Sequence, residues 1–146
     1  MGIEFEPSQF QIGQNLPEMK KQIVQKEINL YAKASRDFNP IHIDEEYARK
    51  TPLGGTIAHG MLVLAYVSQM MANNFGKEWL TGGSLNIRFK APARPGDILT
   101  IRGTIRKIQN EPDRTVISCD VLCANQKNET VISGEALVRI KNENIN

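Results

Sequence analysis

The spacing of apolar residues changes character along the chain. From Ala58 to Asn73 the residues are apolar almost all round a helical wheel, which predicts a long helix that is buried on most of its faces. From Ser84 onwards apolar and polar residues alternate, as in strands with one buried face. These alternating runs are separated by turn residues and cover residues 84–90, 98–108, 115–125 and 130–141. The pattern therefore predicts a buried helix followed by an antiparallel meander.

The first third of the chain predicts shorter elements. A strand and two helices are expected at residues 19–24, 26–35 and 45–50. Residues 37–52 are rich in polar residues and prolines. Because Pro40 fixes its own φ and pushes Asn39 towards extended geometry, the preceding helix cannot continue here. We expect a stiff loop that begins at Asp37.

Together these elements predict an α+β fold with one domain over residues 1–146. An antiparallel sheet wrapped around a long central helix is the economical packing for one apolar helix and three or four long strands, and this arrangement is the hot-dog fold. The length of 146 residues suits one hydrophobic core. Since such a sheet leaves edges that commonly pair, we expect a homodimer, or a dimer of dimers, with strand 84–90 near the interface.

Charge gives little support for a nucleic-acid partner. The formal net charge is +2, whereas a nucleic-acid binder usually carries a concentrated basic stripe. The basic residues form two loose groups, which are Lys20, Lys21 and Lys26, and Arg88, Lys90 and Arg94. Solvated surface is the simpler interpretation of both groups. The alternative is a docking surface for phosphates or an acidic carrier.

The sequence also predicts a cytoplasmic protein with no membrane partner. Residues 1–10 lack the basic start and apolar core of a signal peptide, and the apolar run 57–71 is shorter than the about 20 residues that cross a bilayer. Cys119 and Cys123 are four residues apart in a predicted strand, which separates them by roughly 13 Å. They cannot form a disulfide there, so a reducing compartment fits.

The densest group of chemically useful residues lies where the stiff loop is expected. Asp37, Asn39 and His42 fall within six positions. A carboxylate and an imidazole held close together can orient a water and exchange protons with it. A calcium loop that started at Asp37 would need glycine and glutamate where His42 and Ala48 stand. Two other interpretations remain, namely a capped loop with a surface histidine, and a metal site built from His42, His59 and a carboxylate.

Three segments in order resemble one family. Asp37-x-Asn39-Pro40-x-His42 is similar to the hydratase 2 motif of the MaoC-like (R)-specific enoyl-thioester hydratases. The resemblance continues in residues 55–61, at the entry to the central helix, and in residues 88–97. It covers roughly residues 22–108, and the last strands agree in pattern only.

The resemblance implies a hydro-lyase of fatty-acid metabolism. The reaction is the reversible hydration of trans-2-enoyl thioesters of coenzyme A or acyl carrier protein to (R)-3-hydroxyacyl thioesters, with no metal or cofactor. Asp37 and His42 are the implied catalytic residues that activate water, and Asn39 helps to hold the site. The Gly60 N–H, at the start of the central helix, is implied to bind the thioester carbonyl oxygen. His59 is expected beside the substrate, in a packing role rather than a catalytic one.

One residue departs from the family pattern. Arg36 precedes Asp37 where the family often has glycine, and it either fills a helix C-terminus, alters substrate access or binds a phosphate. Two alternative functions stay open at this point. One is a hot-dog thioesterase, and the other is a non-catalytic acyl-binding partner subunit.

Overall fold

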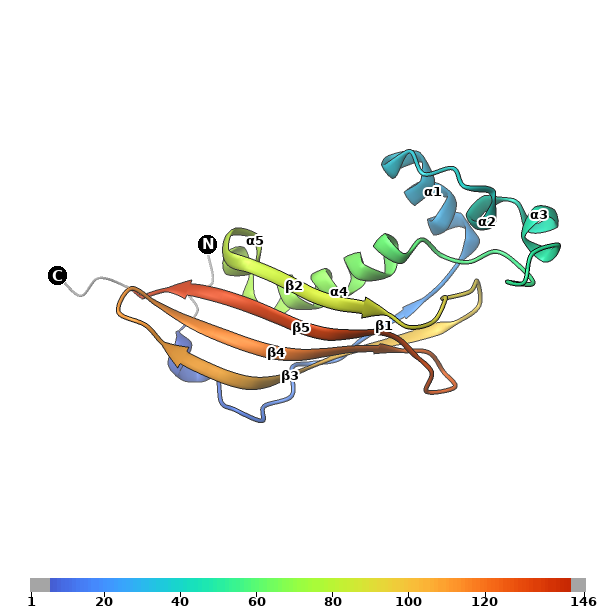
Figure 1. The fold of residues 1–146 in the computed structure, drawn as a ribbon. Helices are drawn as coiled ribbons and strands as arrows, with labels where there is room; N and C mark the ends of the chain where they lie inside the picture. The colour runs from blue at the N-terminus through green and yellow to red at the C-terminus, as the bar shows by residue number, and fades with distance from the viewer. Residues whose placement is uncertain (1–5, 143–146) are drawn as a thin grey trace.

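A computed structural model describes residues 6–142, and within them the strands form one antiparallel sheet with a long helix against its concave side (Figure 1). The strand order is β1-β3-β4-β5-β2. The strands are β1 (Met19–Gln22), β2 (Gly83–Phe89), β3 (Ile98–Asn110), β4 (Arg114–Ala124) and β5 (Thr130–Lys141). The predicted α+β arrangement is confirmed, with β1 and β2 as the two edge strands. The predicted domain extends beyond the described part at both ends, by residues 1–5 and 143–146. Half of the segment 1–10 therefore also lies outside the described residues.

The predicted long helix is α4 (Gly60–Phe75), which begins and ends two residues later than expected. Seven of its residues are buried against the sheet, namely Leu62, Val63, Tyr66, Val67, Met70, Met71 and Phe75. Burying a large apolar side chain contributes roughly 1.5–3 kcal/mol, so this stripe is a main source of the fold's stability. No helix within residues 6–142 is long and apolar enough to cross a membrane.

The prediction that α4 is buried on most faces is wrong for a single chain. Met61 is 58% exposed, and Ala65 is also exposed. The sheet covers only one side of the helix (Figure 1). Residues on the opposite side therefore stay accessible although they are apolar.

The alternation of β3 is confirmed residue by residue in its first half. Leu99, Ile101, Gly103 and Ile105 are buried, and the residues between them are not. The register against β4 then shifts between Ile105 and Lys107. Such a bulge adds one residue to one strand and bends it, which ends the strict alternation. The sheet also has one strand more than the meander alone predicts, because β1 pairs with the other edge of β3.

Three helices lie together at one end of the sheet (Figure 1). They are α1 (Gln25–Ser35), α2 (Pro40–Ile43) and α3 (Glu45–Arg49). The first and last were predicted, but α2 replaces part of the expected loop. Asn39 caps this helix by accepting a hydrogen bond from Ile41 N, and Pro40 is its first residue. Asparagine at the N-cap and proline at the first helical position are both favourable, so Asn39-Pro40 starts a helix here.

A further short helix, α5 (Lys77–Gly82), lies at the opposite end of the sheet and was not predicted. Gly76 has a φ of 54° and separates α5 from α4. The buried Trp79 fastens α5 by donating a hydrogen bond from Nε1 to Ser68 Oγ on α4 at 2.9 Å. One more short segment, the 3-10 turn η1 (Pro7–Gln9), precedes β1.

Among the described strands, β2 contacts only β5, and the two backbones lie very close together. Ile87 pairs with Gly134 of β5. A Cβ on Gly134 would lie 2.3 Å from Asn86 O and 2.6 Å from Ile87 Cα. Since both neighbours are backbone atoms, nothing flexible can move aside. The edge strand is therefore tied to β5 at a position that admits only glycine.

We expect Gly134→Ala to lower the free energy of unfolding by about 2 kcal/mol, because overpacking of this kind typically costs 1–3 kcal/mol. Urea denaturation followed by circular dichroism measures the change. Glu135→Ala is the matched control, since Glu135 is exposed on the same strand. A Gly134→Ala variant as stable as the wild type would contradict this account of the β2–β5 junction.

Candidate active site

The structure brings the predicted acid and imidazole together at the end of α1. Asp37 Oδ2 lies 4.0 Å from His42 Nε2, and the two side chains are 52% and 10% exposed. Arg36, with a φ of 64°, is the C-cap of α1 and turns the chain out of the helix just before Asp37. The other carboxylate oxygen, Asp37 Oδ1, accepts a hydrogen bond from Asn39 N at 3.2 Å. This leaves Oδ2 facing His42.

The orientation of the His42 ring is set by a backbone carbonyl. His42 Nδ1 lies 2.8 Å from Ile57 O. Because a carbonyl oxygen only accepts, Nδ1 carries the proton and Nε2 turns its lone pair towards Asp37. The backbone of His42 is also held, since Gln25 Nε2 donates to its carbonyl oxygen at 2.7 Å. Both ring and backbone therefore have fixed partners.

His59 lies directly against this pair. Its side chain is almost completely buried, and its ring stacks on that of His42 with centroids 3.9 Å apart and an interplanar angle of 26°. His59 Nε2 lies 3.0 Å from Asp37 O, so this nitrogen donates and binds the loop to the start of α4. Among the described residues His59 Nδ1 has no hydrogen-bond partner. The Tyr31 ring of α1 packs nearby, with centroids 4.8 Å apart.

A polar network that was not predicted joins three segments next to the site. Thr56 Oγ1 lies 2.8 Å from Gln25 Oε1 and 3.0 Å from Glu45 Oε2. Thr56 N donates to the same Glu45 oxygen at 3.0 Å. The backbone and side-chain hydrogen bonds from Thr56, with a smaller contribution from Arg49, hold the pKa of Glu45 below its ordinary value. The three linked residues come from α1, α3 and the segment before α4, a separation in sequence that offers no local signal.

The other two predicted residues take different positions. Asn39 uses its side-chain oxygen to cap α2, so it fixes the start of the helix that carries His42. Gly60 is the first residue of α4 and follows His59 directly. The first N–H groups of a helix lack partners within it and lie at the positive end of its dipole. A Cβ on Gly60 would lie 3.0 Å from Phe89 Cε1, so a larger residue here would crowd the Phe89 ring.

Gly60 borders a hollow of about 370 Å³. The hollow is largely apolar, with one cation at its rim, and is lined by residues that include Ile57, Gly60, Val63, Phe89, Lys90 and Pro92. Asp37 and His42 do not line it. They connect to it through Ile57, whose carbonyl holds the His42 ring. The sequence resemblance marked residues 88–97 as a motif, but it assigned Phe89 and Lys90 no place beside Gly60.

The same cluster has the composition of a metal site. Ligand atoms of Asp37, His42 and His59 all lie within 4.8 Å of one another. Each histidine binds a backbone carbonyl with one nitrogen, as metal-binding histidines commonly do. However, an imidazole binds a metal through a lone pair in its ring plane. The two stacked rings hold their lone pairs in nearly parallel planes, which is unfavourable for meeting at one ion.

Comparison with known proteins gives a consistent result. The MaoC like domain model matches residues 8–122. The chain is 30% identical to the 3-hydroxybutyryl-CoA dehydratase of Methylorubrum extorquens over 122 residues, which cover 84% of this chain and 76% of the relative. It is 31% identical to the (R)-specific enoyl-CoA hydratase of Rhodospirillum rubrum, with 84% and 83% covered.

A solved structure agrees with the sequence comparison. The R-hydratase PhaJ1 from Pseudomonas aeruginosa superimposes with a TM-score of 0.80 at 28% identity, and the match covers 94% of this chain and 86% of that one. The described fold is therefore the hot-dog fold of these hydratases. Because the family model covers most of the chain, the protein belongs to the MaoC like domain family.

Proposed function

We propose that this protein catalyses the reversible hydration of trans-2-enoyl thioesters to (R)-3-hydroxyacyl thioesters. The observation that carries the proposal is the Asp37–His42 pair, in which the imidazole Nε2 faces a carboxylate oxygen at 4.0 Å. Relatives that act on coenzyme A thioesters by their names support an acyl-CoA substrate. The class of reaction is that of a hydro-lyase.

The spacing of the pair suits a water molecule. Two acceptors cannot hydrogen-bond to each other, and a separation of 4.0 Å leaves both of them within reach of one bridging donor. A water placed between them donates one hydrogen to Asp37 Oδ2 and one to His42 Nε2. In the hydration direction the water oxygen bonds to C3 of the enoyl group, and the water gives up one proton to the pair. The pair returns a proton to C2, so the protons balance over the cycle.

Gly60 is the residue that we propose to polarise the thioester. Negative charge develops on the thioester oxygen as C3 is attacked, and a fixed N–H donor lowers the barrier by stabilising that charge. The Gly60 N–H lies at the start of α4, where the helix dipole adds to the effect. His59 and Asn39 then act as supports that hold the Asp37 loop and α2, close to the substrate but outside the bond changes.

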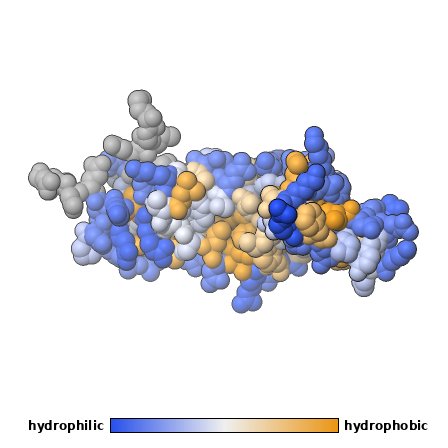
Figure 2. Space-filling model, turned by 90° about the horizontal axis from the view of Figure 1, so that it is seen from above, coloured by the Kyte–Doolittle hydropathy of each residue, from blue (hydrophilic) through white to orange (hydrophobic). Residues whose placement is uncertain are grey.

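A homodimer through β2 is the second part of the proposal. This strand is an edge of the sheet, and most of its residues are exposed. Seen from the side of the helices, apolar atoms are exposed in a band along the middle of the molecule (Figure 2). Exposed apolar residues include Met61 of α4 at 58% and Phe89 of β2 at 53%. Pairing β2 with its copy would protect the strand edge and cover such residues.

We also propose a cytoplasmic location. Cys119 and Cys123 are free thiols in the core. Burial raises the pKa of both thiols to about 12, with Asp120 adding to the effect at Cys119. They therefore stay protonated and unreactive at neutral pH, which fits the reducing compartment expected from their spacing.

We expect Asp37→Asn and His42→Gln each to lower the hydration rate by at least about 100-fold, as for loss of a general acid or base. The assay follows the loss of the conjugated enoyl-thioester absorbance with crotonyl-CoA. Circular dichroism checks that each variant is folded. Asp44→Asn is the matched control, because Asp44 is a nearby exposed aspartate that caps α3.

Near-normal turnover by folded Asp37→Asn or His42→Gln would contradict the assignment. The same assay with a thiol reagent separates the alternative functions. Release of free thiol without hydration would indicate a thioesterase. If the wild type neither hydrates the substrate nor releases free thiol, the protein would be a non-catalytic acyl-binding subunit.

We expect the rate to be independent of metal ions. The proposed chemistry needs only an acid/base pair and the Gly60 N–H, since the alkene is already conjugated to a carbonyl. Prolonged dialysis against a chelator should leave kcat unchanged. If the treatment abolished activity and one divalent ion restored it, Asp37, His42 and His59 would have to be reassigned as ligands.

We expect the protein to be a homodimer at micromolar concentration, which light scattering measures as twice the mass of 16.4 kDa. Replacing Asn86, which is exposed at the centre of β2, by aspartate should weaken the dimer, because the symmetric pairing would set two like charges opposite each other. A monomeric wild type would contradict the proposal. A tetramer would be compatible with it, as a dimer of such dimers.

A further inference from the structure

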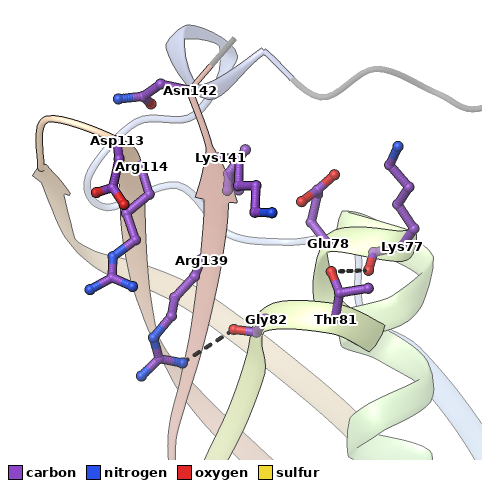
Figure 3. Close-up of a pocket in the computed structure, with 10 residues that line it drawn as sticks. Lys77, Glu78, Thr81, Gly82, Asp113, Arg114, Arg139, Lys141 and Asn142 are labelled. Carbon is purple, nitrogen blue, oxygen red and sulfur yellow. Dashed lines mark hydrogen bonds between the residues drawn. The ribbon is translucent and has the colours of Figure 1, made fainter. Parts of the chain in front are cut away.

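A second and larger hollow lies at the end of the sheet opposite to Asp37 and His42. Its volume is about 700 Å³, and α5, the β3–β4 turn and the end of β5 surround it (Figure 3). Four cationic and two acidic side chains line it, namely Lys77, Arg114, Arg139, Lys141, Glu78 and Asp113. The proposed reaction uses none of these residues. This group was not predicted from the sequence, because its members come from three distant segments.

The cations are placed in a way that folding alone does not explain. Arg114 of β4 pairs directly with Lys141 of β5. Like charges directly opposite each other destabilise a sheet. Arg139 is two residues before Lys141 and so lies on the same face of β5. Although Arg114 has an ion pair with Glu111, the cluster keeps a surplus of positive charge. A bound anion would relieve this repulsion.

Arg139 has a fixed position but no carboxylate partner within residues 6–142. Its Nη1 donates to Gly82 O at 3.2 Å and approaches Ser84 Oγ at 3.5 Å (Figure 3). The guanidinium therefore has donors left for a further acceptor, in the fork geometry that matches phosphate oxygens. It is held at the junction of α5 and β2, directly beside the sheet edge.

This hollow is far from the active site of its own chain. Gly60 begins α4 and Lys77 follows the end of the same helix. The 16 residues of α4 separate the two ends by roughly 24 Å. The proposed dimer changes this relation. An antiparallel pairing of β2 with its copy, centred on Asn86, sets Ser84 of one protomer beside Arg88 of the other.

Such a pairing extends the cationic group across the interface. Arg88 is exposed, and Lys90 lies at the rim of the smaller hollow that Gly60 borders. Both belong to the basic group for which the sequence left a phosphate-binding role open. In the dimer they approach the hollow that contains Arg139 of the second copy. A single anionic ligand can then touch both chains.

We infer that the hollow of one protomer binds the phosphate groups of coenzyme A while the thioester reacts in the active site of the other protomer. The inference rests on the proposed hydratase function and dimer. A nucleotide with several phosphates suits a hollow lined by several cations, and about 700 Å³ is within the usual range for small-ligand pockets. An acyl carrier protein presents a protein surface instead, and a concave site of this size is not needed for it.

The first test compares substrates with and without phosphates. The double variant Arg139→Gln/Lys141→Gln should raise KM for crotonyl-CoA at least about 10-fold, the effect of about 1.4 kcal/mol of lost binding. It should leave kcat unchanged. KM for the N-acetylcysteamine thioester of crotonate, which has no phosphate, should also stay unchanged. Lys20→Glu, on the opposite edge strand, is the charge control and should change neither value.

The second test decides which protomer supplies the phosphate site. Dimers that combine one Asp37→Asn chain with one Arg139→Gln/Lys141→Gln chain contain a single intact acid/base pair, located in the second chain. If the phosphate site acts across the interface, the intact hollow of the first chain serves that pair. The mixed dimer should then show the wild-type KM for crotonyl-CoA at half the wild-type kcat.

The outcomes separate the inference from the function on which it rests. An unchanged KM for crotonyl-CoA in the double variant, or a raised KM in the mixed dimer, would overturn the inference while hydratase activity persists. An equal rise in KM for crotonyl-acyl carrier protein would also overturn it, because the site would then recognise the carrier's acidic surface. Failure of the wild type to hydrate both crotonyl-CoA and crotonyl-acyl carrier protein would instead reject the proposed function.

Discussion

The packing of α4 against one side of a curved sheet is the constraint on which the rest of the structure depends. Seven apolar residues of the helix are buried against the sheet, and the removal of their side chains from water is the dominant favourable contribution. This packing fixes the direction of the helix and the place where it begins. His59 and Gly60 occupy that beginning, so the position of the site follows from the position of the core.

The site itself is held by hydrogen bonds to the backbone. His42 binds Ile57 O and His59 binds Asp37 O, each with one ring nitrogen. Each bond fixes the ring and decides which nitrogen is free. Such support costs little conformational entropy during a reaction, because the groups are already in position. The stacking of the two rings joins the loop that carries Asp37 to the start of α4.

One-sided packing also leaves features that a single chain does not explain. The outer side of α4 exposes apolar residues, β2 has an open edge, and Arg114 opposes Lys141 across β4 and β5. Each feature alone is a small cost to the folded chain. A second copy paired along β2 and an anion in the hollow would remove these costs together. In an antiparallel pair, the start of β2 in one protomer would lie beside the end of β2 in the other.

The sequence by itself determined the order and type of most elements, because they depend on local periodicity. The alternation of β3, the apolar run of α4 and the short spacing from Asp37 to His42 are all readable without contacts. Asn39-Pro40 also carried the signal for α2, but the two residues were interpreted as part of a stiff loop. The Asp37–His42 pair was predictable for the same local reason, since both residues lie in one short segment.

The tertiary structure alone decided which residues of distant segments contact one another. Thr56 meets Gln25 and Glu45, Phe89 covers Gly60, and Arg139 meets Gly82, and none of these pairs is close in sequence. Whether the outer face of α4 is covered was also beyond the pattern, because apolar residues mark a face as suitable for burial without saying what buries it. Local periodicity records which side chains avoid water, whereas only the packed chain determines which of them meet.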